Sequence, residues 1–202
     1  MHLDKYHKTS DKRNVYEVTS GPELGSYVIV EGPFSYADMD KTLPGTKEHS
    51  LDLEKNFTPK LEPGSQNFIA RWADTLSHNG ETKAEKFLLT ITMVKDGKMA
   101  GYLTEIRRNA LISAKLKSPF SYNILIKQQA GSSPMVIGIR HLKDGYKELE
   151  SNYFQLPQNG FRDAYVAEYG QEAWDKRVKL FVDDIVSREQ HFEKIRTDLS
   201  SN

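Results

Sequence analysis

The segment from Gln128 to Pro134 contains residue types that can bind an anion. It follows an apolar run that predicts a strand, and it combines two amides with small residues. Consecutive backbone N–H groups in such a turn can hold a phosphate or a carboxylate. The candidate ligand-binding residues are therefore Gln128, Gly131, Ser132 and Ser133. A hairpin loop that binds nothing accounts for the same residues.

The spacing of Gln128, Gly131 and Ser133 is Gln-x-x-Gly-x-Ser. Over these six residues the segment resembles the pyrophosphate loop of the GNAT acetyltransferases, and this resemblance implies acetyl-CoA binding. In that family the loop opens a helix, whereas the apolar run 135–137 predicts a strand here. A transferase is therefore one alternative function, and we expect no cofactor.

His141 is the candidate for acid–base chemistry, and Asp144 and Tyr146 follow it closely. A histidine oriented by a carboxylate can act as a general base. A histidine at the end of a strand that makes one structural hydrogen bond fits the same pattern. His141 is therefore the weak catalytic candidate of the transferase alternative.

The chain contains no cysteine, which excludes disulfides, thiolate metal sites and cysteine nucleophiles. His2, Asp4 and His7 have side chains that can bind a metal. A frayed N-terminus over residues 1–13 explains them more simply, so we expect no metal site.

The charge balance argues against a nucleic-acid partner. Lysine and arginine number 28, aspartate and glutamate number 28, and the formal net charge is zero. Nucleic-acid binding generally needs a basic excess.

The first 13 residues lack the apolar core of a signal peptide, and no apolar run is long enough to cross a bilayer. We expect a cytoplasmic protein with no membrane contact.

The elements that would position these residues predict an α+β fold, with a mainly antiparallel sheet packed by helices in a single domain over residues 1–202. Strands are expected at 14–18, 26–31, 121–127 and 135–141. Asp96-Gly97 between two apolar stretches predicts a β-hairpin over 86–107. Helices are expected at 66–77, 110–117 and 146–154, and residues 37–65 are expected to be irregular or mobile.

A long amphipathic C-terminal helix is predicted from about Gln171 to Leu199. Its seam follows steps of three and four residues, with Arg188 as the one polar member. The apolar stripe narrows after Arg188, so the second half of the helix is expected to bind a partner or a second copy of the chain. The residues expected to bind the partner are Arg188, Phe192, Ile195 and Leu199. Six aromatic residues are expected to pack where this helix docks: Tyr153, Phe154, Phe161, Tyr165, Tyr169 and Trp174.

Three functions fit these observations. The first is a small interaction or regulatory protein without catalysis, which binds a protein partner, with a homodimer as the simplest case. The second is a ligand-binding α+β fold with an apolar cavity under the last helix. The third is the transferase built on the 128–134 loop and His141. No motif in the sequence has the specificity to choose among them.

Overall fold

A computed structural model describes residues 5–7, 13–41, 46–61, 67–80, 83–128, 134–151, 153–154, 157 and 159–201. Its internal contacts define two compact units. One comprises Met1–Asn67 with Lys194–Asn202, and the other comprises Phe68–Glu193. Strand β7, Ile185–Ile195, is the element that passes from the second unit into the first.

The first unit contains a β-hairpin and a group of short helices. β1 (Arg13–Val18) and β2 (Tyr27–Glu31) are antiparallel, as the sequence predicts. The C-terminal residues contact this hairpin at β1, where Arg196 N donates to Val15 O at 2.8 Å. The stretch expected to be irregular is largely helical where it is described, and that prediction is wrong there. It contains α2 (Tyr36–Met39), α3 (Thr46–Asp52), a π-helical Leu53–Phe57 and a 3₁₀ turn at Thr58–Lys60.

From β4 to β7 the second unit has a β-α-β-β-α-β order, and the short strand β3 precedes it. Its elements are β3 (Ala70–Trp72), a 3₁₀ turn (Asp74–Leu76), β4 (Lys86–Val94), α4 (Met99–Lys115), β5 (Ser121–Lys127), β6 (Met135–Leu142), a 3₁₀ turn (Gly145–Leu149), α5 (Gly160–Tyr169), α6 (Gln171–Asp183) and β7. The strand order in this unit is β7-β4-β6-β5-β3. Each helical connection therefore returns two strands away, which is the split βαβ arrangement of ferredoxin-like folds.

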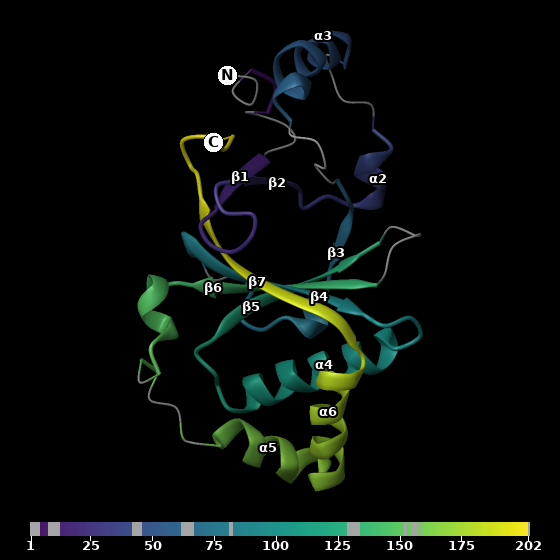
Figure 1. The fold of residues 1–202 in the computed structure, drawn as a ribbon, viewed down its shortest axis with the longest axis vertical. Helices are drawn as coiled ribbons and strands as arrows, with labels where there is room; N and C mark the ends of the chain where they lie inside the picture. The colour runs from purple at the N-terminus through teal and green to yellow at the C-terminus, as the bar shows by residue number, and fades with distance from the viewer. Residues whose placement is uncertain are drawn as a thin grey trace. The chain divides into compact units, whose positions relative to one another are not determined.

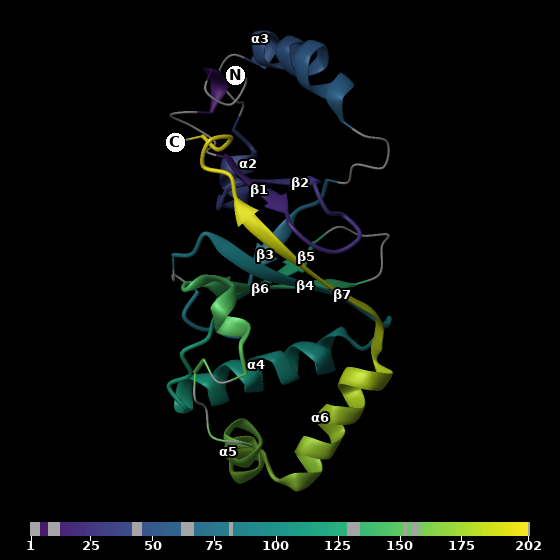
Figure 2. The same ribbon diagram turned by 60° about the vertical axis from the view of Figure 1, so that its left-hand side comes forward.

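In the first unit, the strand order is β2-β1-β7, where β7 contributes its C-terminal end. The register confirms antiparallel pairing of β4 with β6 and of β5 with β6. In Figures 1 and 2, α4 and α6 lie on the same side of the β4–β7 strands. Between these helices and the sheet lies a core formed by Ala73, Leu76, Val94, Tyr102, Ile124, Ile126 and Val136. The predicted α+β fold with an antiparallel sheet is confirmed.

The predicted hairpin over 86–107 is wrong in its second half. Residues 86–94 form β4, and Gly97 has the positive φ of a turn at 74°. The chain then enters α4 instead of a strand, and the hydrogen bond from Tyr102 N to Lys98 O, at 3.1 Å, belongs to the first helical turn. Tyr102 and Ile106 are four residues apart, a spacing that places them on one face of a strand and of a helix alike. The helix extends to Lys115, so the short helix predicted at 110–117 is the end of α4.

The predicted C-terminal helix is confirmed only to Asp183. Residues Ile185–Ile195 form β7, where the seam was expected to continue as a helix. Two sequence features explain the change. Asp183 and Asp184 place negative charge at a helix C-terminus, where the helix dipole is unfavourable to it. The β-branched pair Ile185-Val186 then favours an extended backbone.

Two shorter helix predictions are also wrong. In the 66–77 segment, β3 pairs with β5, with Arg71 opposite Ile126. Ala73 and Leu76 are buried while Trp72 is 43% exposed, so these residues do not share a helical face. The 146–154 segment holds only the 3₁₀ turn Gly145–Leu149 in its described part. The strands predicted at 121–127 and 135–141 are confirmed.

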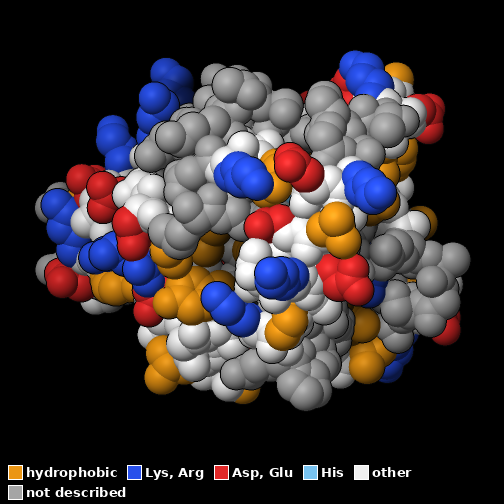
Figure 3. Space-filling view, turned by 90° about the horizontal axis from the view of Figure 1, so that it is seen from above, with side chains coloured by type: hydrophobic (Ala, Val, Ile, Leu, Met, Phe, Trp, Pro, Cys, Tyr) orange, Lys and Arg blue, Asp and Glu red, His pale blue; other side chains and the backbone are white. Residues whose placement is uncertain are grey.

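The surface mixes charges of both signs. On the face shown in Figure 3, basic, acidic and hydrophobic side chains are interspersed among the described atoms. This pattern agrees with the zero net charge of the chain.

Candidate functional site

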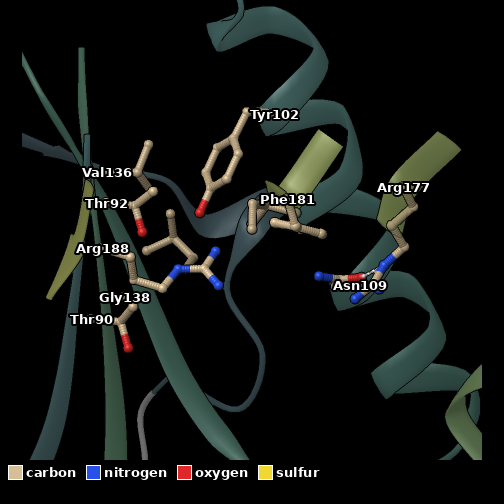
Figure 4. A pocket seen from close by; sticks show the side chains of 11 residues that line it. Thr90, Thr92, Tyr102, Asn109, Val136, Gly138, Arg177, Phe181 and Arg188 are labelled. Atoms are coloured by element: carbon tan, nitrogen blue, oxygen red, sulfur yellow. Dashed lines mark hydrogen bonds between the residues drawn. The ribbon is translucent and has the colours of Figure 1, made fainter. Parts of the chain in front are cut away.

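A cavity of about 450 Å³ lies within the second unit, between the sheet and helices α4 and α6. Its volume is within the range of pockets that hold small molecules. Four strands and both helices contribute to its walls, so it forms where the two layers meet (Figure 4). The lining residues are Thr90, Thr92, Tyr102, Ile106, Asn109, Ile124, Val136, Gly138, Arg177, Phe181 and Arg188.

Arg177 of α6 is half-buried and held from several sides. Its Nε donates to Asn109 Oδ1 at 3.2 Å, the bond drawn in Figure 4. Its guanidinium carbon lies 4.9 Å from the ring centroids of both Trp174 and Phe181. Burial lowers the pKa of Arg177, although the nearby Tyr165 and Glu105 act in the opposite direction. An arginine is nevertheless charged at neutral pH, so this is a fixed positive charge in a partly dehydrated place.

Arg188 of β7 is the second cation of the cavity. Its guanidinium carbon lies 5.5 Å from the Phe181 ring centroid. Figure 4 shows its head pointing into the space beside Phe181. Across the described ranges of the chain, neither Arg177 nor Arg188 forms an ion pair with an acidic side chain. The cavity lining also includes no aspartate or glutamate. The cavity is therefore distinctly positive in a chain that is neutral as a whole.

The remaining lining combines apolar walls with hydroxyl groups. Tyr102 is only 3% exposed, and Figure 4 shows its hydroxyl pointing toward the cavity. No hydrogen bond to this hydroxyl exists within the described part of the chain. Thr90 Oγ1 accepts a hydrogen bond from Gln190 Nε2 at 2.9 Å. The cavity thus offers polar contacts at a few points and hydrophobic contacts elsewhere.

A buried polar network beside the cavity contains Glu105, the carboxylate that acts electrostatically on Arg177. Tyr165 is fully buried and donates to Glu105 Oε2 at 2.6 Å, and Arg108 Nη1 donates to Glu105 Oε1 at 2.7 Å. Burial, and then the hydrogen bond to Glu105, raise the pKa of Tyr165. Because Glu105 already has two strong partners, Arg177 keeps its charge available to the cavity.

The residues of the transferase alternative do not meet in a described site. His141 Nε2 lies 2.9 Å from Asn123 Nδ2, and its ring contacts Phe87 at a centroid distance of 5.3 Å. Gln128 Nε2 donates to Ile126 O at 3.2 Å. Gly131, Ser132 and Ser133 lie outside the described residues. Neither His141 nor Gln128 lines the cavity.

The four residues predicted to bind a partner do not form one helical stripe, because β7 is extended. Side chains alternate along a strand, so Ile195 lies on the opposite face from Arg188 and Phe192. Phe192 contacts Tyr146 at a centroid distance of 5.0 Å, and Leu199 lies in a turn after the strand. Arg188 alone among the four lines the cavity.

The N-terminal metal candidates are only partly described. His2 and Asp4 lie outside the described residues. His7 is 1% exposed, and its Nε2 lies 3.2 Å from His49 Nε2. Among the described residues, no group of three or more His, Cys, Asp or Glu side chains is arranged to hold a metal ion.

Sequence reasoning missed Arg177, although a signal was present. Arg177 is three residues after Trp174 and four before Phe181, so it shares their helix face. Aromatic packing at the last helix is confirmed around Tyr165, whose ring contacts Phe161, Tyr169 and Trp174 at 6.4, 4.9 and 5.5 Å.

Comparison with known proteins identifies the fold and no family. No protein-family model and no curated sequence matches the chain. A solved structure described as an anthrone oxidase-like protein is similar, with a TM-score of 0.58 and 11% sequence identity. The match covers 96% of this chain and 81% of the other. No helix in the described residues is long and apolar enough to cross a membrane. At this identity the likeness establishes only a shared α+β fold.

Proposed function

We propose that this protein binds a small molecule carrying an anionic group in the cavity between the sheet and helices α4 and α6. The observation that supports this proposal is the pair of arginines, Arg177 and Arg188, which line the cavity without an acidic partner among the described residues. It modifies the ligand-binding alternative from the sequence, which expected an apolar cavity under the last helix, by adding a cationic lining.

The energetics of Arg177 favour an anionic ligand. Partial burial removes water from its guanidinium, and Glu105 offsets that loss only in part, because Arg177 forms no ion pair with a carboxylate among the described residues. Asn109 takes the Nε hydrogen bond, which leaves both Nη nitrogens for a ligand. Guanidinium groups bind carboxylates and phosphates through paired, charge-assisted hydrogen bonds. A bound anion would therefore stabilise Arg177 in its present position.

Matched probes test the proposal. Benzoate and 2-naphthoate should bind and raise the melting temperature, whereas benzamide and 2-naphthamide, of the same shape but uncharged, should bind far more weakly. Isothermal titration calorimetry and thermal shift would measure both effects. Arg177→Met should abolish the preference for the acid. Arg162→Met on α5 is the control, because Arg162 is exposed and outside the cavity. Equal binding of the acids and amides would contradict the proposal.

We also propose protein binding as a second candidate function, because three valines of the second unit are unusually exposed. Val178 and Val182 on α6 and Val186 on β7 are 47%, 72% and 61% exposed. Val178 and Val182 are four residues apart and share one face of α6, and grouped apolar side chains are typical of association surfaces. Sedimentation of the wild type and of Val182→Lys would test it. A wild-type protein that stays monomeric at every concentration would contradict self-association through this surface.

A further inference from the structure

The two cavity arginines lie on either side of one aromatic ring. The Phe181 ring centroid is 4.9 Å from the guanidinium carbon of Arg177 and 5.5 Å from that of Arg188. Figure 4 shows the two guanidiniums at separate positions, with Phe181 between them. Because the Phe181 ring lies between them, the arrangement favours two separate binding points over a single clamp on one small anion.

The two arginines also differ in their surroundings. Arg177 is half-buried and fixed by Asn109, whereas Arg188 is exposed on β7. Arg177 is thus a preorganised inner site, and Arg188 is an outer site that solvent reaches. A ligand spanning the cavity would place one group at each.

We propose that the ligand is a dicarboxylate, with one carboxylate on Arg177, the other on Arg188, and an apolar spacer beside Phe181. This inference rests on the proposed anion-binding function and specifies its ligand class. A monoanion can pair with only one of the two guanidiniums, whereas a dianion can form a charge-assisted pair with both. The side chains of Ile106, Ile124 and Val136 form the apolar wall that the spacer would contact.

The spacer can also carry a polar atom. The Tyr102 hydroxyl has no hydrogen-bond partner within the described residues and points into the cavity. A hydroxyl that faces the cavity can donate or accept one hydrogen bond, so an oxygen or nitrogen on the spacer would be bound there. Tyr102 would therefore select among dicarboxylates of similar length.

The test compares each diacid with its own monoamide, which has the same shape and one neutral end. The probes are terephthalate and biphenyl-4,4′-dicarboxylate, two lengths of rigid spacer, with the monoamide and the diamide of each. Calorimetry at constant ionic strength should show at least one diacid binding about tenfold more tightly than its monoamide, because each charge-assisted pair adds to affinity.

Substitutions of the two arginines test which arginine binds each carboxylate of the ligand. Arg188→Gln should reduce the diacid-to-monoamide ratio to near one and leave monoamide affinity almost unchanged. Arg177→Gln should weaken the diacid and the monoamide alike. Arg162→Gln should change neither. Because Arg188 is exposed, its variant should keep the melting temperature of the unliganded wild type.

The outcomes separate this inference from the proposed function. If monoamides bind better than diamides but diacids gain nothing over monoamides, anion binding stands and the dicarboxylate inference is overturned. The same holds if Arg188→Gln leaves the ratio unchanged. If no acid binds better than its diamide, both the inference and the proposed function fail.

Discussion

Replacing Tyr165 with phenylalanine should destabilise the second unit substantially. The ring is fully buried, and the substitution removes only the hydroxyl, which donates to Glu105 Oε2 at 2.6 Å and accepts from Arg108 Nη1 at 3.3 Å. Glu105 is 6% exposed, so water cannot replace the lost bond. A hydrogen bond to a charged group contributes about 1.5–3 kcal/mol, and that is the expected loss in free energy of unfolding. Arg108 still pairs with Glu105, which favours the lower half of this range.

Urea denaturation followed by tryptophan fluorescence is a suitable assay. Both tryptophans, Trp72 and Trp174, belong to the second unit, so the signal reports on that unit. The midpoint should fall by about 1 M urea with an unchanged slope. Tyr169→Phe is the matched control, because no hydrogen bond to the Tyr169 hydroxyl exists in the described chain. Its effect should stay within about 0.5 kcal/mol.

The pH dependence gives a second measure of the same interaction. The pKa of Tyr165 is raised above its ordinary value of 10.0 by burial and by its hydrogen bond to Glu105. Its contribution is therefore fully present below pH 10 and is lost as the pH rises through the folded-state value. The stability difference between wild type and Tyr165→Phe should narrow above pH 10. Equal effects of the Tyr165 and Tyr169 variants, or a difference that does not depend on pH, would refute the reasoning.

Two further predictions concern local structure. At Gly80 an added Cβ would lie 2.0 Å from Asn123 Oδ1, so Gly80→Ala should lower the free energy of unfolding by about 1–3 kcal/mol. At Gly101 in α4 the nearest atom to an added Cβ is 3.6 Å away, so Gly101→Ala should raise the free energy of unfolding by about 0.5–1 kcal/mol. Thermal unfolding of the pair would show this, and a neutral Gly80→Ala would contradict it. At exposed Ser187 in β7, valine should be more stable than alanine by up to about 1 kcal/mol, because extended backbone favours β-branched residues. The opposite order, measured by urea denaturation, would indicate a helix there.

Several features of this protein follow from the sequence alone. The strands at 13–18, 27–31, 121–127 and 135–142 have short β-branched or aromatic runs bounded by turn residues, and local chemistry is enough to define them. The first half of the last helix, Gln171–Asp183, likewise repeats at three and four residues over a stretch with good helix formers. The α+β class with an antiparallel sheet follows from these elements.

The errors occur where one spacing fits both a helix and a strand. A step of four residues returns to the same face in both structures, so Tyr102 with Ile106 and Arg188 with Phe192 were ambiguous. Tertiary packing decided them in opposite directions. Residues 99–115 form a helix that covers the sheet, and residues 185–195 form a strand beside β4. The residues that adjoin the two strands are also bonded, because Lys95 N donates to Asp184 O at 2.9 Å.

The candidate site depended on that decision. Arg188 is the one polar member of the apolar seam in the sequence. Its predicted role in partner binding assumed a helix through residue 199, but α6 ends at Asp183. The sequence gives Arg177 no distinguishing signal beyond its shared face with Trp174 and Phe181, because a helical arginine is ordinarily solvated. Only the return of β7 beside β4, with α6 packed over the same sheet face, brings these two cations to one cavity. Residue identity determined the charges, and long-range strand pairing determined that they share a site.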